Sequence, residues 1–206
     1  MKLYTYIITR DYGFAPNPYG EMCTLATCKP QIRRGAVIGD WVAAFGGANT
    51  PVRGKLVMLM QVQKVCSYDE YWEDEQYKKK KPVYNRSMNE AYGDNIYHHV
   101  DGKWIQELSH HSNRDGSINY KNLNRDTGTD RVLISNCNYY YFGNNAIDIP
   151  DIFQDFANCG RGHRVFDDEI LINQFVEYVF TNTPHPGING IPFNRRVGEF
   201  AHYKGE

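Results

Sequence analysis

The fold is decided by residues 56–65, LVMLMQVQKV, which give the strongest strand pattern in the chain. Apolar side chains occupy nearly every position, and this is typical of a strand that is buried on both faces of a sheet. The run is much shorter than the roughly 20 apolar residues that a membrane-spanning helix needs. The sequence therefore predicts a buried β-sheet core with a barrel-like arrangement of strands, and no transmembrane helix.

Shorter patterns lie on both sides of this stretch. Residues 3–9 alternate between two faces, and residues 41–45, 131–135 and 139–143 are short apolar or aromatic runs, all of which indicate strands. The clearest helix begins at Asp167 or Asp168 and carries Leu171, Phe175 and Val179 on one stripe. The predicted fold class is α+β: a small β-barrel-like mixed sheet with a C-terminal amphipathic helix over residues 168–181.

Composition sets the size and number of domains. The chain has 206 residues, of which 41% are hydrophobic and 23% charged, enough for one large domain. Residues 83–131 are polar and rich in Asn, Asp, Gly, Tyr and His, too aromatic for simple disorder. No repeat or linker is apparent, so the sequence predicts one domain over residues 1–206 with a polar insertion at about 83–131.

Charge and cysteine content bear on the surroundings of the protein. The chain has 23 basic and 24 acidic residues, so net charge neither favours nor excludes a polyanionic partner, although local basic clusters can form a positive face. The first ten residues lack the apolar core of a secretory signal. Five cysteines, an odd number, fit reduced thiols better than a disulfide framework. We expect a cytoplasmic protein.

The first candidate site is the loop of residues 9–20, TRDYGFAPNPYG. Two prolines make it rigid, and it presents a carboxylate, a carboxamide and several aromatic rings, which is costly without a ligand to bind. Its candidate binding residues are Asp11, Tyr12, Phe14, Asn17 and Tyr19. In the alternative interpretation, Asp11 and Asn17 only cap turns while the rings cover the core.

The second candidate site is Gly160–Arg164, GRGHR. The two glycines let backbone N–H groups approach an anion, and the arginines can bind phosphate oxygens. The segment lacks the spacing and the ending of a Walker loop. The alternative is an exposed basic turn ahead of the C-terminal helix.

Metal and cofactor motifs are not found in the sequence. Cys23, Cys28 and the pairs His98-His99 and His110-His111 follow no standard zinc spacing, so buried or solvated roles are favoured for them. There is no Gly-x-Ser-x-Gly elbow, no papain-like cysteine context and no dinucleotide-binding fingerprint. The sequence predicts no metal and no cofactor, and leaves the histidine pairs without a role.

Several motifs together resemble the nucleotide modification associated domain family of the second type. They are residues 9–18, TRDYGFAPNP, residues 23–30, CTLATCKP, and Gly39-Asp40-Trp41, with Tyr140–Gly143 and Gly160–His163 further along the chain. The resemblance spans most of the chain. It implies association with DNA-modification and phage-conflict systems, and it implies this setting more firmly than any one reaction.

A looser likeness is to the pseudouridine-synthase-and-archaeosine-transglycosylase-like (PUA) barrels, including the EVE and ASCH types. It is carried by Arg33-Arg34, residues 39–42, the strand at 56–65 and residues 67–71, which follow the order seen in those domains. The likeness implies a barrel that holds a flipped or modified base in an aromatic pocket. The Tyr-rich composition agrees with such a pocket.

These observations lead to a functional hypothesis with two alternatives. The protein recognises a hypermodified base flipped out of DNA, such as that of a phage, and excises it by hydrolysis of the N-glycosidic bond, with Asp11 stabilising the oxocarbenium-like transition state. The alternatives are a non-catalytic reader of such bases and an enzyme that modifies free nucleotides. The stacking residues also include Trp41, and the expected phosphate contacts are Lys29, Arg33, Arg161, His163 and Arg164.

Overall fold

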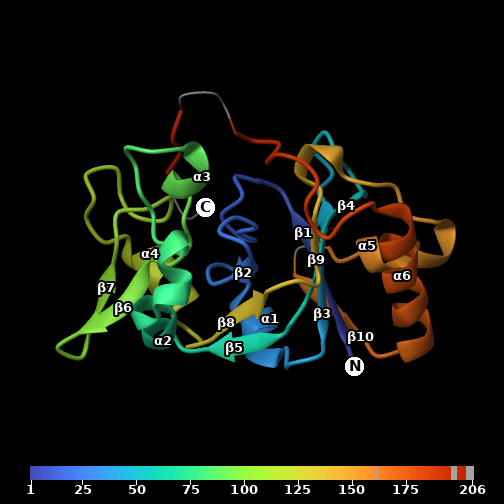
Figure 1. Ribbon diagram of the computed structural model, residues 1–206, viewed down its shortest axis with the longest axis horizontal. Coiled ribbons are helices and arrows are strands. Elements are labelled where there is room, and N and C mark those ends of the chain that lie inside the picture. The colour runs from blue at the N-terminus through green and yellow to red at the C-terminus, as the bar shows by residue number, and fades with distance from the viewer. Residues whose placement is uncertain (161, 196–198, 203–206) are drawn as a thin grey trace.

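The computed structural model describes residues 1–160, 162–195 and 199–202, and these form three sheets (Figure 1). The largest is a mixed sheet of six strands, in which β1 lies parallel to β3 and β9 parallel to β11 while the other neighbours are antiparallel. In spatial order its strands are β10 (His163–Phe166), β1 (Leu3–Ile8), β3 (Trp41–Gly46), β4 (Leu56–Gln61), β9 (Tyr139–Tyr141) and β11 (Gly187–Ile188).

The α+β class is confirmed, but the predicted barrel is wrong. Among the described residues, β10 and β11 lie at opposite edges of the large sheet and do not pair with each other, so this sheet stays open. The two edge strands are short, four and two residues long, and short edges limit further pairing.

The stretch at residues 56–65 forms two strands in two different sheets. β4 ends at Gln61, and β5 (Lys64–Cys66) belongs to a three-stranded sheet with β8 (Val132–Ser135) and β2 (Cys23–Leu25). At the crossing, the N–H of Val62 still bonds to Asp40 at 2.8 Å, whereas the N–H of Gln63 bonds to Ile134 at 2.8 Å. The apolar pattern continues from β4 into β5 because both strands contribute side chains to the core between the two sheets.

Both faces of the large sheet are covered. Helix α6 (Glu169–Asn182) begins after Asp168, whose side chain accepts the N–H of Leu171 at 3.0 Å, as the sequence predicts for this helix. Its residues Ile172, Phe175 and Val179 join Ala43 and Phe45 in one apolar cluster. Phe153 of η3 (Asp151–Phe153) and Phe156 of α5 (Gln154–Ala157) belong to the same cluster, and η2 (Gly143–Asn145) follows β9 in the chain. On the other face, Tyr6, Ala44 and Met58 pack toward the three-stranded sheet.

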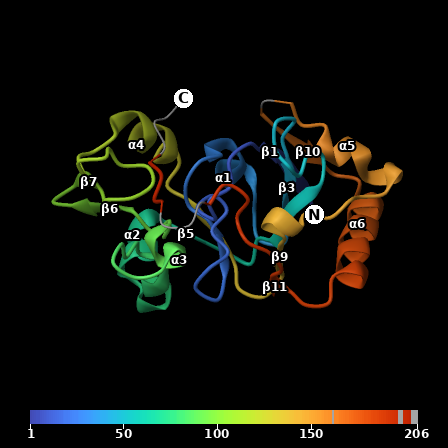
Figure 2. The ribbon, with the colours of Figure 1, turned by 90° about the horizontal axis from the view of Figure 1, so that it is seen from above.

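The predicted insertion is part of a third compact region, at the far end of the molecule from α6 (Figures 1 and 2). This region comprises α2 (Tyr68–Glu73), η1 (Glu75–Lys80), α3 (Met88–Ala91), β6 (Tyr97–Val100), β7 (Lys103–Gln106) and α4 (Tyr120–Asp126). Its buried tyrosines, such as Tyr71 and Tyr97, share an apolar cluster with Phe14 and with Ile134 of β8. The insertion is therefore packed onto the three-stranded sheet, and its buried side chains form the core between them.

The loop that follows β1 and the short helix α1 (Pro30–Gly35) lie between the large sheet and the third region (Figure 2). This central position brings residues from the beginning of the chain next to residues 110–126 of the insertion. Among the described residues, no helix has the length and apolar character needed to cross a membrane.

Candidate active site

A cavity of about 460 Å³ opens between β1, the start of α1 and the insertion. One side is formed by Tyr6, Ile7 and His163 of the large sheet, and the other by His110, His111 and Arg125 of the insertion. The loop after β1 contributes Arg10, Tyr12 and Phe14, and Cys28, Lys29 and Pro30 connect the two sides. The volume lies in the usual range of small-molecule sites, about 300–1,000 Å³.

Cys28 lies on a tightly constrained turn in this cavity. Cys28 and Lys29 have φ values of 56° and 40°, a left-handed conformation that is uncommon for residues with a side chain and that often marks functional positions. The turn is fastened on both sides: the N–H of Cys28 donates to Asp126 Oδ1 at 2.9 Å, and its carbonyl accepts from Arg33 Nε at 2.9 Å. The sulfur position is thereby fixed by the backbone.

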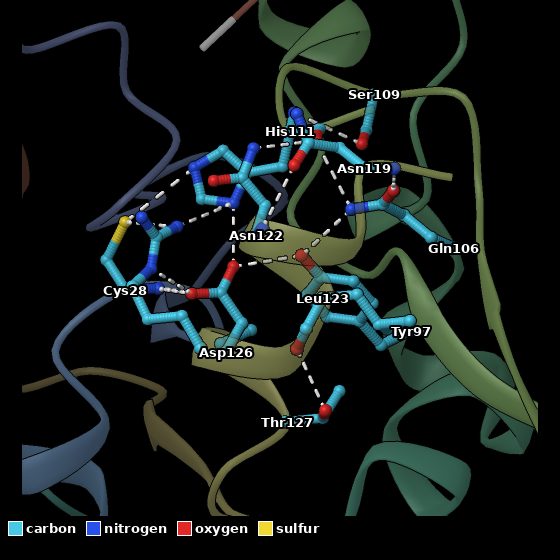
Figure 3. Close-up of polar contacts among 12 residues, drawn as sticks. Cys28, Tyr97, Gln106, Ser109, His111, Asn119, Asn122, Leu123, Asp126 and Thr127 are labelled. Carbon is cyan, nitrogen blue, oxygen red and sulfur yellow. Dashed lines mark hydrogen bonds and ion pairs between the residues drawn. The ribbon is translucent and has the colours of Figure 1, made fainter. Parts of the chain in front are cut away.

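His111 connects the sulfur to a buried carboxylate (Figure 3). Its Nε2 lies 3.7 Å from Cys28 Sγ, and its Nδ1 lies 2.7 Å from Asp126 Oδ2. The Cys28–His111–Asp126 group therefore has the arrangement of a catalytic triad: a nucleophile, a base, and a carboxylate that orients the base. Phe14 packs against His111, with ring centroids 4.6 Å apart, and restricts the position of the imidazole ring.

Asp126 is completely buried and fully hydrogen-bonded. In addition to Cys28 and His111, it accepts bonds from Arg125 Nε at 3.0 Å and from the Tyr97 hydroxyl at 2.9 Å. A buried carboxylate with this many donors is held in its ionised form. Burial by itself raises the pKa of Asp126, but the positive charges of His111 and Arg125 outweigh burial and hold the pKa well below its usual range.

The same ion pair acts on the histidine. Burial lowers the pKa of His111, yet the Asp126 carboxylate and the Cys28 sulfur together raise it to about 9. The imidazole therefore carries a proton at neutral pH, and its Nε2–H points to the sulfur. A protonated imidazole next to a cysteine sulfur is the pairing found in enzymes with a nucleophilic cysteine.

The three side chains also lie close enough to hold a metal ion, since their ligand atoms are within 4.8 Å of one another. The charge distribution does not suit a cation. Arg125 Nη2 lies 3.9 Å from Cys28 Sγ, and Arg125 Nε bonds to Asp126, so a guanidinium already neutralises two of the three ligands. We therefore assign this group to nucleophilic chemistry.

The predicted catalytic residue, Asp11, has a different environment. Its side chain is buried, accepts the Tyr141 hydroxyl at 2.7 Å and the N–H of Gly13 at 3.0 Å, and does not line the cavity. Its backbone exchanges hydrogen bonds with Asn194 at 2.7 and 2.9 Å. Burial raises the pKa of Asp11, and the hydrogen bonds from Tyr141 and Gly13 oppose the rise. Asp11 therefore fastens the loop after β1 to the large sheet.

The predicted base-binding residues separate into two groups. Tyr12 and Phe14 line the cavity next to His110, with ring centroids 4.8 and 5.0 Å from it. Asn17, Tyr19 and Trp41 do not line it. The Asn17 amide bonds to the carbonyl of Tyr92, Tyr19 stacks under Arg195, and Trp41 packs in the core against Phe180 of α6.

The predicted phosphate-binding residues also separate. Lys29 and His163 line the cavity. Arg33 is completely buried and donates to four backbone carbonyls, those of Cys28, Asp126, Thr129 and Arg131. Arg164 pairs with Asp155 on the surface, and Arg161 lies outside the described residues.

Sequence reasoning missed the triad. Its members are 83 and 15 residues apart, and Cys28, His111 and Asp126 match no spacing motif. The pair His110-His111 was predicted to be buried or solvated without a function. The pair is buried, but both rings line the cavity, and the His111 ring also contacts the Cys28 sulfur. Only the packing of the insertion against the turn at Cys28 brings the three groups together.

Comparison with known proteins gives one match. The family model described as nucleotide modification associated domain 2 matches residues 1–198, a range that includes the cavity and all three members of the triad. Neither the curated proteins nor the solved structures give a match. The chain therefore belongs to the nucleotide modification associated domain 2 family, as its motifs indicate, and its role is tied to modified nucleotides.

Proposed function

We propose that the protein is an enzyme that binds a modified nucleotide in the central cavity and acts on it with Cys28 as the nucleophile. The observation that carries this proposal is the hydrogen-bonded series Cys28–His111–Asp126, in which the cysteine and the histidine line the cavity and the aspartate is buried behind them. Membership of the family supports nucleotides as the substrate class.

The cavity lining suits a nucleotide. Tyr12, Phe14 and His110 offer flat rings on which a base can stack. Arg10, Lys29 and Arg125 supply positive charge, and no carboxylate lines the cavity within the described residues. An aromatic and cationic lining favours a ligand that has both a planar ring system and a negative charge.

The triad suits substitution at an acyl-type carbon of the substituent on the base. The Cys28 thiolate forms a bond to this carbon, and the displaced electron pair leaves with the heteroatom, which takes the proton from His111 Nε2. Neutral His111 then removes a proton from water, the resulting hydroxide breaks the carbon–sulfur bond, and the thiolate and the imidazolium are restored. Asp126 keeps the imidazole oriented throughout and stabilises its charge.

Base excision from phage DNA and non-catalytic reading remain competing proposals, since the same aromatic cavity suits a flipped base. Excision needs a carboxylate close to the sugar. Asp11 is hydrogen-bonded to Tyr141 outside the cavity. Among the described residues, no Asp or Glu lines the cavity. The triad favours the third hypothesis from the sequence, an enzyme acting on nucleotides.

The test is incubation of the protein with a panel of acyl-, amido- and glycosyl-modified nucleotides and with hypermodified phage DNA. Products are followed by mass spectrometry, and the intact protein mass is checked for a substrate adduct. We expect a product and an adduct on Cys28, and loss of both in Cys28→Ala. Cys137→Ala, which changes an exposed cysteine outside the cavity, is the matched control and should behave as the parent protein.

Three outcomes would overturn the proposal. Turnover that persists in Cys28→Ala shows that Cys28 is not the nucleophile. Release of a free base from DNA in that variant identifies a glycosylase. Binding of modified DNA without any chemical change identifies a reader.

A further inference from the structure

The cavity has a second polar feature, on the side of the large sheet away from His111. Lys29 follows Cys28 directly, but its side chain extends to β1, where its Nζ lies over the Tyr6 ring, 4.8 Å from the centroid. Its one hydrogen bond among the described residues is a long contact of 3.4 Å to the carbonyl of Ile7. No carboxylate of the described chain pairs with this ammonium group, which has three N–H donors to satisfy.

Tyr6 adds an independent observation. The residue is 1% exposed and lines the cavity, yet its buried hydroxyl has no hydrogen-bond partner among the described residues. A buried polar group without a partner costs free energy, and most such groups in proteins are satisfied. An acceptor on a ligand beside β1 would satisfy the Tyr6 hydroxyl and the Lys29 ammonium group together.

A third polar side chain lies on the same side of the cavity. His163 of β10 lies opposite Tyr6 in the sheet register and also lines the cavity. Burial lowers the pKa of Lys29, and the sulfurs of Cys28 and Cys159 oppose this effect only in part. An ammonium, a phenol and an imidazole on neighbouring residues of one cavity wall match a group with several oxygen acceptors and a negative charge.

We infer that Lys29 and Tyr6 form a phosphate subsite, so that the substrate is a nucleoside phosphate whose phosphate group lies at β1 while its base faces Cys28. This inference rests on the proposed function for the position of the base. The two adjacent residues of one left-handed turn then serve the two ends of one ligand: the sulfur of Cys28 faces His111, and Lys29 extends to the large sheet.

The test is calorimetric binding of a deoxynucleoside, its 5′-monophosphate and a short oligonucleotide containing it, using Cys28→Ala so that no turnover occurs. Inorganic phosphate is the competitor. We expect the monophosphate to bind about tenfold or more tightly than the nucleoside, as a charge-assisted hydrogen bond allows, and to be displaced by phosphate. Weaker binding of the oligonucleotide would identify a terminal phosphate as the ligand, and tighter binding an internal one.

Substitutions distinguish the loss of this subsite from a general loss of folding or binding. Lys29→Met should remove the preference for the monophosphate over the nucleoside, Lys29→Arg should retain most of it, and Tyr6→Phe should weaken it about threefold. Lys103→Met, an exposed lysine on β7, is the matched control. Equal binding of nucleoside and monophosphate, or an unchanged preference in Lys29→Met with an unchanged melting temperature, would overturn the inference.

The failure of the subsite and the failure of the proposed function remain distinguishable. Lys29-dependent phosphate binding without any Cys28-dependent turnover leaves the subsite in place and rejects the chemistry. Cys28-dependent turnover of a nucleoside that is insensitive to Lys29→Met supports the chemistry and rejects the phosphate subsite.

Discussion

The N–H of Cys28 donates a 2.9 Å hydrogen bond to Asp126 Oδ1, so the carboxylate that orients the histidine also holds the backbone of the nucleophile. The other oxygen, Oδ2, accepts from His111 at 2.7 Å. One buried side chain of the insertion therefore fixes both reacting groups relative to each other. A change at Asp126 is expected to alter the chemistry of Cys28 without touching the sulfur.

Asp126→Asn should lower the reactivity of Cys28. Loss of the carboxylate charge removes the main cause that raises the pKa of His111, so less imidazolium accompanies the sulfur at pH 7. We expect alkylation of Cys28 by iodoacetamide to slow about tenfold, measured by peptide mass spectrometry. The exposed Cys137 in the same sample is the internal control. An unchanged rate at Cys28 would show that the carboxylate does not tune the thiol.

The stability of the protein should fall with rising pH above neutrality because of His111. Its pKa is raised from 6.5 to about 9 in the folded state, so its protonated form contributes stability in full below about pH 6.5. This contribution is lost as the pH rises through 9, with a slope of up to about 1.4 kcal/mol per pH unit. Denaturant unfolding of the parent and of His111→Gln should converge between pH 6.5 and 9. A constant difference over this window would contradict the assignment.

Arg33→Met should destabilise the fold by about 3 kcal/mol or more, because four backbone carbonyls lose the completely buried guanidinium group that donates to them. Urea unfolding measures the loss. Arg34→Met is the control, since Arg34 is exposed and should change stability by less than about 1 kcal/mol. If Arg33→Met instead retains full stability and loses only nucleotide binding, the phosphate contact predicted from the sequence is right and the structural role is wrong.

Asp11→Asn distinguishes the sequence-based role of this residue from its structural surroundings. An asparagine keeps one acceptor for Tyr141 but loses the charge, so we expect a stability loss of about 1–2 kcal/mol and unchanged turnover per folded molecule. Thermal unfolding and activity are measured on the same preparation. Loss of turnover at an unchanged melting temperature would restore Asp11 as the catalytic carboxylate.

Local patterns in the sequence were enough for many individual elements. The alternation in residues 3–9 gives β1, and Asp168 is the N-cap that begins α6. These features depend on neighbours within four residues, so one sequence carries the whole signal. The loop after β1, which the sequence singles out as a candidate site, contributes Tyr12 and Phe14 to the lining of the cavity.

The tertiary structure decided how the elements are joined and where the chemistry lies. A continuous apolar run at residues 56–65 cannot reveal that β4 and β5 belong to different sheets, because burial looks the same in both. Likewise, Asp11 and Arg33 have suitable chemical groups, but buried partners occupy them. Cys28, His111 and Asp126 are distant in sequence and come into contact only when the insertion packs on the three-stranded sheet. The sequence by itself determined many of the elements and the family. The site depended on long-range packing, for which a single sequence contains no local signal.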